Sequence, residues 1–341
     1  MQARGGIEGS SGPEPLTGAT AAAGSAAGAS GLLGDTAARD YSRKLRLFNA
    51  FAAPELQLAV THLGLAPGMR VLDAGCGTGE VLQWLHEAVG PAGMVVGMDL
   101  AAAHAQAARA AAPAGAQVLQ ADLLRACIAP GALDLVWSVN TVNHFRDPVA
   151  GLRSLAALLR PGGRIAVGQS ALLPEMYFAW DARLERLTRE AVRRYYQARY
   201  GLDERDLRGV RNVLGWMQRA GLGNVAVRTL VIERVAPLRK ADEEYLLEAI
   251  FRGTFGERLR PYLTAEDHQA LAGLCDPQHP AFALRRADFH FLQTLTFLSF
   301  STWYPTRVNF LHFGQTICTF ATGRGLVMVI ISDFCPSIRP F

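Results

Sequence analysis

Three glycines at alternating positions follow a short apolar run in the stretch Val71-Leu72-Asp73-Ala74-Gly75-Cys76-Gly77-Thr78-Gly79-Glu80. An apolar run that ends in glycines predicts a buried strand that breaks into a tight loop and opens a helix. Glycine suits such a loop because it has no Cβ and the backbone can approach a ligand closely. The helix expected from Glu80 would direct free N–H groups at a negative or polar group of that ligand.

Two phosphate-binding motifs resemble this loop only in part. A Walker loop requires Gly-Lys-Ser/Thr, and the stretch contains no lysine. The dinucleotide fingerprint is Gly-x-Gly-x-x-Gly, whereas the spacing here is Gly-x-Gly-x-Gly, with Asp73 two residues ahead of Gly75. A carboxylate at the strand end would repel a pyrophosphate. It would suit a cationic ligand that carries an ammonium and a sulfonium group.

Four further motifs follow the glycine loop along the chain. They are 93–100, which ends in Asp99-Leu100, then Gln120-Ala121-Asp122-Leu123, then 135–140 with Asn140 at its end, and 158–167 with the turn Arg160-Pro161-Gly162-Gly163. The distance of 20 residues from Gly79 to Asp99 is one helix plus one strand. That spacing alone also fits nicotinamide enzymes. The five motifs in this order resemble the class I S-adenosylmethionine-dependent methyltransferases, over about residues 41–296 and most strongly over 70–170.

The resemblance implies a cofactor, S-adenosylmethionine, and a set of residues that bind it. Asp73 would lie near the ammonium group of the cofactor, Asp99 would accept both ribose hydroxyls, Asp122 would bind the adenine amino group and Asn140 would border the methionine end. The Leu123 amide would reach the adenine ring. The full set of cofactor-binding residues expected from the resemblance is Asp73, Gly75, Cys76, Gly77, Gly79, Asp99, Leu100, Asp122, Leu123 and Asn140.

Short β-branched runs alternate with helical patterns from Met69 onward. This alternation predicts a parallel sheet covered by helices on both faces. Ligands of such sheets bind beyond the carboxyl ends of the strands, where the polar residues named above fall. The expected strands are 70–73, 94–99, 117–120, 133–139, 164–169, 224–233 and 289–297, and the first helices are 80–89, 102–112 and 148–159. The fold class predicted is α/β, a Rossmann-like, doubly wound, seven-stranded sheet in which, by the resemblance, six strands are parallel and the last is antiparallel.

The chain divides into three segments of different composition. Residues 1–38 are rich in Gly, Ala and Ser, bury little apolar surface and are expected to be disordered. Residues 39–297 form the predicted methyltransferase-like domain, with helical insertions at about 171–208 and 236–287 that would cover the substrate. Residues 298–341 have no recognisable period and are interpreted as an appendage of unknown role.

Composition excludes some classes of partner. The net charge of +4 is small, and the arginines between 181 and 211 are interleaved with acids, which favours a solvated helical face over a nucleic-acid site. The 5 cysteines lack close pair spacing, so neither a metal site nor a disulfide framework is expected, and a cytoplasmic location is the default. No run approaches the length of a membrane span.

The sequence therefore predicts a methyltransferase that transfers a methyl group to a small-molecule acceptor by in-line displacement. A nicotinamide-dependent oxidoreductase and an inactive cofactor-binding interaction protein are the alternatives. The catalytic residue is unknown: His144 follows the fourth strand, but a role in starting the next helix explains it more simply. The acceptor, the methylated atom and the oligomeric state are not encoded in any pattern found.

Overall fold

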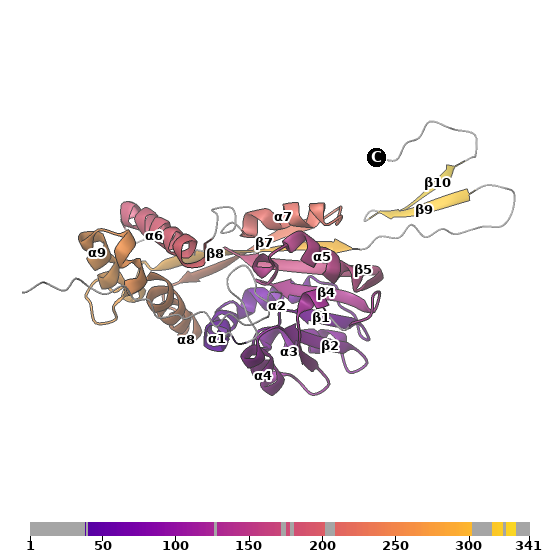
Figure 1. Cartoon of the computed structure of the whole chain (residues 1–341), viewed down its shortest axis with the longest axis horizontal. Helices are drawn as coiled ribbons and strands as arrows, with labels where there is room; N and C mark the ends of the chain where they lie inside the picture. Colours follow the sequence, from indigo (N-terminus) through magenta and orange to yellow (C-terminus); the bar gives the residue numbers. More distant parts are fainter. Residues whose placement is uncertain are drawn as a thin grey trace, which may run out of the picture.

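The computed structural model of the chain describes residues 38, 40–125, 128–171, 175–177, 181–201, 209–301, 316–322 and 325–331 (Figure 1). The expected disordered segment, 1–38, lies outside the described residues except for Ala38.

A mixed sheet forms the centre of the molecule. Its strand order is β3-β2-β1-β4-β5-β8, with β7 on the far side of β8. The first five are parallel, β8 is antiparallel to both β5 and β7, and β7 is therefore parallel to the first five. The bounds are β1 (Arg70–Ala74), β2 (Met94–Asp99), β3 (Gln117–Gln120), β4 (Leu133–Val139), β5 (Leu159–Ser170), β7 (Ala226–Val235) and β8 (His290–Ser301).

This arrangement confirms the predicted sheet of six parallel strands and one antiparallel last strand. One more strand, β6 (Glu175–Tyr177), pairs with the beginning of β8 and makes the sheet eight-stranded. The strands pack because both faces are apolar: β1 and β4 are almost wholly buried, which is typical of a parallel sheet covered on two sides.

Helices cover the two faces in separate groups. On one face Phe51, Leu56, Leu82 and Leu85 join a core that includes Trp137 of β4. On the other face Leu152 and Val213 pack with Leu72. The first group consists of α1 (Ser42–Phe51), α2 (Ala53–Thr61), α3 (Glu80–Val89) and α4 (Ala102–Ala111), and the second of α5 (Pro148–Ala157), α7 (Gly209–Arg219) and the short helices η1 (Leu123–Arg125) and η2 (Val142–His144).

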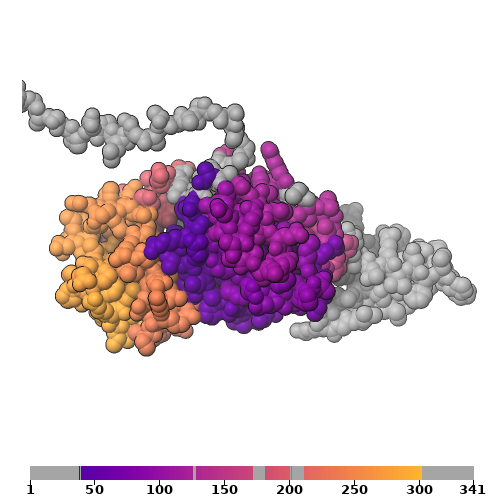
Figure 2. Space-filling view, turned by 90° about the horizontal axis from the view of Figure 1, so that it is seen from below, coloured from indigo at the N-terminus to yellow at the C-terminus, as the bar shows by residue number. Residues whose placement is uncertain are grey.

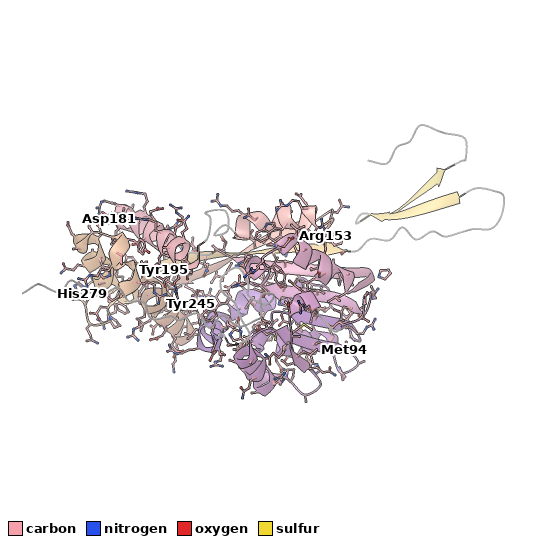
Figure 3. All side chains as sticks on the ribbon, viewed as in Figure 1. Met94, Arg153, Asp181, Tyr195, Tyr245 and His279 are labelled. Atoms are coloured by element: carbon pink, nitrogen blue, oxygen red, sulfur yellow. The ribbon has the colours of Figure 1, made fainter. Side chains whose placement is uncertain are left out.

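The two segments interpreted as insertions contain helices that pack against one another. Tyr195 meets Tyr262 edge-on, with ring centroids 6.4 Å apart, and Arg183 forms an ion pair with Asp267. Figure 3 marks Tyr195 and Tyr245 in this part of the molecule. The helices are α6 (Ala182–Tyr200) in the first segment, and α8 (Lys240–Glu244), the π-helix η4 (Tyr245–Phe255), η5 (Glu257–Tyr262), α9 (Ala265–Cys275) and η6 (Ala283–Arg285) in the second.

These helices lie beyond the end of the sheet where β8 begins (Figure 1). Because β8 is antiparallel to β5, this is the carboxyl end of the parallel strands. Helix α1 lies between the insertion and the sheet: Phe51 stacks on Tyr245 of η4 with ring centroids 4.3 Å apart. Figure 2 shows the N-terminal helices in indigo between the orange insertion and the magenta domain.

The last strand of the sheet runs past the expected domain boundary at Phe297. Strand β8 continues through Leu298, which is 2% exposed, to Ser301, which pairs with Arg164. Farther on, β9 (Thr316–Thr322) and β10 (Gly325–Ile331) form an antiparallel hairpin of their own.

Candidate cofactor site

The glycine loop is held against the end of β2. The amides of Gly75 and Cys76 both donate to the Met98 carbonyl, at 2.8 and 3.1 Å. Gly75 has φ +82° and a Cβ there would lie 2.1 Å from Thr141 Oγ1, so only glycine fits. Gly79 has φ +88°, and its Cβ would lie 2.9 Å from the Cα of Ala108. The two glycines therefore allow the loop after β1 to pack closely against the end of β4 and against α4.

Asp99 is the organising side chain of the loop. Its Oδ2 accepts from the Gly77 amide at 2.9 Å, and its Oδ1 accepts from the Ala101 amide at 2.9 Å. His104 Nδ1 lies 3.2 Å from the same Oδ1. Hydrogen bonds from N–H groups to an ionised carboxylate are among the stronger ones in proteins. They fix the orientation of Asp99 at the carboxyl end of β2, where the sequence predicts a ribose-binding acid.

Asp73 is 3% exposed and lies at the end of β1. Burial, and after it the nearby carboxylates of Asp99 and Glu80, together raise the pKa of its carboxyl from 3.8 to about 8. The negative potential around the glycine loop thus opposes a second negative charge. A cation placed beside Asp73 would be stabilised there.

The pKa of Asp73 predicts how stability changes with pH in the protein without added ligand. Between pH 3.8 and about 8 the folded protein keeps a proton that the unfolded chain has released, so stability falls as pH rises through this window. This carboxyl should lower the free energy of unfolding by about 2 kcal/mol between pH 6 and pH 8. Asp73→Asn, which mimics the protonated form, should remove that part of the slope in urea titrations. An unchanged slope in the variant would show that Asp73 is already ionised at pH 6.

Asn140 follows β4 and has a positive φ of 53°, which is uncommon for a residue other than glycine. Its Oδ1 accepts from the Ser170 amide at 2.8 Å, from Ser170 Oγ at 3.0 Å and from Gln169 Nε2 at 3.1 Å. The side-chain oxygen is therefore fully used in hydrogen bonds to β5. The amide nitrogen is the group left to donate elsewhere, at the edge where Thr141 touches Gly75.

The remaining expected residues lie around the end of β3. The Ala121 amide donates to the Asp99 carbonyl at 3.0 Å, which places this end beside β2. Asp122 Oδ1 accepts from the Leu124 amide at 2.9 Å, so one oxygen of Asp122 caps the turn of η1. Leu123 is buried and Leu100 is half-buried. The adenine contacts expected of Asp122 and Leu123 stay predictions.

Cys76 is buried in the loop at 6% exposure. Burial raises the pKa of its thiol well above the ordinary value, and Asp73 and Asp99 raise it further. A thiol in this environment is a poor nucleophile, which favours the interpretation of Cys76 as a small residue that fits the turn.

Two residues at the site, Glu80 and His104, were not expected from the sequence. Glu80 accepts from Thr78 Oγ1 at 2.7 Å and from Asn49 Nδ2 of α1 at 2.6 Å. His104 bonds Asp99 from within a run of alanines. A polar residue in such a run was the available signal for His104, and an acid in the first helical turn was the signal for Glu80.

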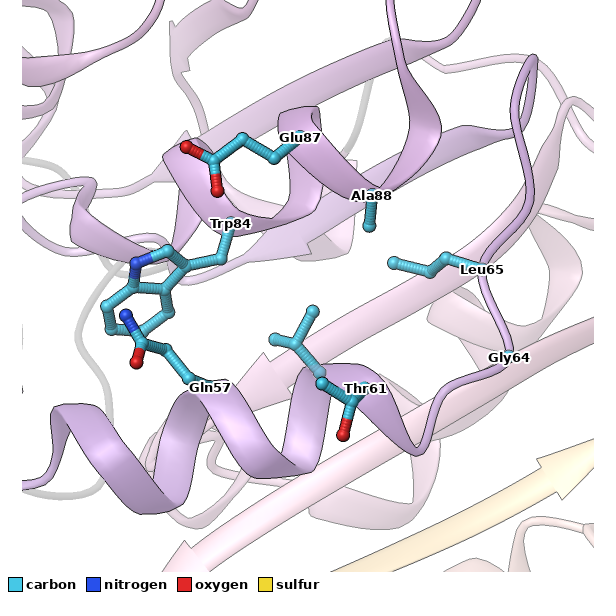
Figure 4. A pocket seen from close by; sticks show the side chains of 8 residues that line it. Gln57, Thr61, Gly64, Leu65, Trp84, Glu87 and Ala88 are labelled. Atoms are coloured by element: carbon cyan, nitrogen blue, oxygen red, sulfur yellow. The ribbon is translucent and has the colours of Figure 1, made fainter.

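A surface pocket of about 460 Å³ lies elsewhere, between α2 and α3 (Figure 4). Trp84, Gln57 and Leu65 are among its lining residues, and none of the expected cofactor-binding residues is. Among the described residues, no group of three or more His, Cys, Asp or Glu side chains is placed to hold a metal ion. Within the same part of the chain, no helix is long and apolar enough to cross a membrane.

The strand order defines a Rossmann-like fold, and it places Asp99 beside the glycine loop at the carboxyl end of β2. Residues 71–163 match the family model described as a methyltransferase domain. The chain thus carries a class I S-adenosylmethionine-dependent methyltransferase domain, whose superfamily uses S-adenosylmethionine as cofactor.

Known proteins match the chain over part of their length. A 2-phytyl-1,4-naphtoquinone methyltransferase of Thermosynechococcus vestitus is 37% identical over 113 residues, which are 33% of this chain and 50% of the relative. A malonyl-[acyl-carrier protein] O-methyltransferase of Pseudescherichia vulneris is 30% identical over 147 residues, or 42% of this chain and 57% of the relative. The matched part therefore spans about half the length of these relatives.

Among solved structures, a SAM-dependent methyltransferase from Aquifex aeolicus superposes with a TM-score of 0.41 at 18% identity, and the superposition covers 56% of this chain and 93% of that one. These findings give no support to the nicotinamide-dependent oxidoreductase considered from the sequence.

Proposed function

We propose that the protein is an enzyme that transfers the methyl group of S-adenosylmethionine to a small-molecule acceptor. The observation that carries the proposal is the pair of acids at the glycine loop, Asp73 buried at the end of β1 and Asp99 fixed at the end of β2. Together they favour a ligand with a cationic end and a ribose. A pyrophosphate would meet the same negative potential unfavourably.

The residues present fit this cofactor. Asp99 Oδ2 accepts one N–H, which leaves room for a ribose hydroxyl. The Gly77 amide holds this oxygen beside the glycine loop, and Asp73 offers a buried counter-charge to an ammonium group. When bound, the cofactor supplies an electrophilic methyl group on a sulfonium. Aligning the acceptor with it and excluding water are the tasks left to the protein.

The helices of the two inserted segments favour the proposal of a small-molecule acceptor. These helices lie beyond the carboxyl ends of the strands, and α1 lies between them and the sheet (Figure 2). The two relatives act, by their names, on a naphthoquinone and on a malonyl carrier protein. An acceptor screen would therefore begin with reduced quinones and with carboxylic acids. His144 lies in the turn that precedes α5, where its backbone amide donates to the Thr141 carbonyl at 2.9 Å. No catalytic role is proposed for its side chain.

A cytoplasmic location is also a proposal. Among the described side chains Cys76 and Cys275 are free thiols, as expected for a reducing compartment.

The first test is calorimetric titration of the full chain with S-adenosylmethionine, S-adenosylhomocysteine and NAD. Micromolar binding of the first two and none of NAD is the expected result. Because a cation beside Asp73 favours its ionised form, binding near pH 7 should also release a proton, seen as a dependence of the enthalpy on the buffer. Binding of NAD alone would overturn the proposal. Cofactor binding without turnover of any acceptor would favour an inactive interaction protein.

A further inference from the structure

One face of helix α1 lies along the cofactor loop. The Tyr41 amide, at the start of the helix, donates to His104 Nε2 at 2.9 Å. One turn on, Leu45 Cδ1 lies 3.1 Å from where a Cβ on Gly77 would be. A further turn on, Asn49 Nδ2 donates to Glu80 at 2.6 Å. Residues four apart project from the same face of a helix, so α1 directs Leu45 and Asn49 at the glycine loop and the start of α3, while its N-cap residue contacts α4 through His104.

The contacts of His104 assign its tautomer. The Tyr41 amide can only donate, so Nε2 of His104 accepts and the ring proton lies on Nδ1. That N–H then donates to Asp99 Oδ1 at 3.2 Å. His104 is 7% exposed, and its ring stacks on the Tyr41 ring with centroids 6.4 Å apart. The imidazole thus connects the start of α1 directly to the carboxylate of Asp99.

His104 also restricts where Asp99 can accept a further hydrogen bond. A carboxylate has about four acceptor positions, two on each oxygen. On Oδ1 both are used, by the Ala101 amide and by His104 Nδ1. On Oδ2 the Gly77 amide uses one. The acceptor position that is left is on Oδ2, beside the glycine loop, so in this arrangement Asp99 has room for one ribose hydroxyl and not for the two expected from the sequence.

We propose that His104 is a positioning residue with two separable tasks: it orients Asp99 for ribose recognition and it docks the start of helix α1. The inference rests on the proposed function, since it assigns the ribose to Asp99. His104 orients the carboxylate through Nδ1 and holds the start of the helix through Nε2. The opposite side of α1 packs on η4 through Phe51. Through α1, His104 is therefore also connected to the helices of the second inserted segment, on the expected acceptor side.

Two substitutions separate the two halves of this contact. The side-chain nitrogen of asparagine lies near the Nδ1 position, so His104→Asn can keep the donor to Asp99 while it loses the acceptor for Tyr41. The amide group of glutamine reaches the Nε2 position, so His104→Gln can keep the acceptor for Tyr41 while it loses the donor to Asp99. Gln106→Asn, at an exposed position of the same helix, is the matched control.

The experiment measures two quantities in each variant: the affinity for S-adenosylhomocysteine by calorimetry, and amide hydrogen exchange of residues 42–51 in the protein without ligand. His104→Gln should weaken the affinity about tenfold and leave exchange in α1 unchanged. His104→Asn should speed exchange in the first turn of α1 about tenfold and weaken the affinity less than glutamine does. The control should change neither quantity.

A merely structural histidine would give a different result. Both substitutions would then affect exchange and affinity alike, or neither, and either outcome overturns the proposal. If wild-type protein binds S-adenosylhomocysteine and His104→Gln binds it equally well, the proposal fails while the proposed function stands. If wild-type protein does not bind S-adenosylhomocysteine, the proposed function fails, and the role of His104 in ribose recognition fails with it.

Discussion

Arg234→Ala is expected to lower the free energy of unfolding by about 3–5 kcal/mol, because it would leave two carboxylates without their buried counter-charge. Arg234 is 8% exposed and uses all five of its N–H donors. Nε donates to Asp242 at 2.8 Å, and the two terminal nitrogens bind Glu55 bidentately at 2.8 and 2.9 Å. They also donate to the carbonyls of Glu233 at 2.7 Å and Phe51 at 2.6 Å.

The position of this arginine explains the size of the effect. Arg234 lies on β7, Glu55 on α2 and Asp242 on α8, so one guanidinium joins the sheet, the N-terminal helices and the insertion. Burial alone would raise the pKa of Asp242, but hydrogen bonds from Arg239 and Arg234 hold it below its usual value. Asp242 therefore stays ionised in the folded protein and depends on its partners.

Urea denaturation of matched variants would measure the effect. The side chain of Arg239 also binds Asp242 but is 50% exposed, so Arg239→Ala should cost only about 1 kcal/mol. Arg234→Lys keeps the charge and loses the bidentate geometry, so its loss of stability should fall between the other two, and it still gives a value if the alanine variant is too unstable to measure. Equal and small losses for all three variants would show that the buried network contributes nothing to stability.

The order of strands and helices in the first half of the chain follows directly from the sequence. The segments expected at 94–99, 117–120 and 133–139 are β2, β3 and β4 as observed, and the helix expected at 80–89 is α3. Local patterns suffice here because each element is a short apolar run bounded by glycine or a polar residue. Strand β5 begins earlier than expected, at Leu159, because this residue pairs with Leu133 before the Pro-Gly-Gly turn interrupts the register.

The contacts that connect the site to the rest of the chain could not be predicted in this way. Arg234 and Glu55 are 179 residues apart, and Tyr41 and His104 are 63 apart. Each of these four is a single charged or polar residue in a segment whose helix or strand periodicity is set by apolar neighbours. Only the tertiary arrangement shows that their partners are buried beside them. The acids of the glycine loop were predictable because their spacing along the chain is fixed by one helix and one strand.

Asp99→Asn is expected to weaken the binding of S-adenosylhomocysteine at least about 100-fold, which corresponds to about 3 kcal/mol. The substitution removes the charge that accepts from the ribose. It also replaces one acceptor oxygen by an NH₂ group. In one orientation of the side chain this NH₂ group faces the Gly77 amide. In the other it faces both the Ala101 amide and the His104 ring. Both orientations place donor against donor in a buried site, so the glycine loop itself is disturbed.

The matched control is Asp134→Asn, at the other end of the sheet. Asp134 accepts from the Arg70 amide at 2.7 Å, and its side chain also pairs with that of Arg160. The same chemical change there should cost stability without changing the affinity. Asp99→Glu keeps the charge but displaces it by one methylene, and it should bind about tenfold more weakly than wild type. Affinity that survives Asp99→Asn in a folded protein would mean that the ribose is bound elsewhere. The roles assigned here to His104 and to helix α1 would then lose their basis, because both act through this carboxylate.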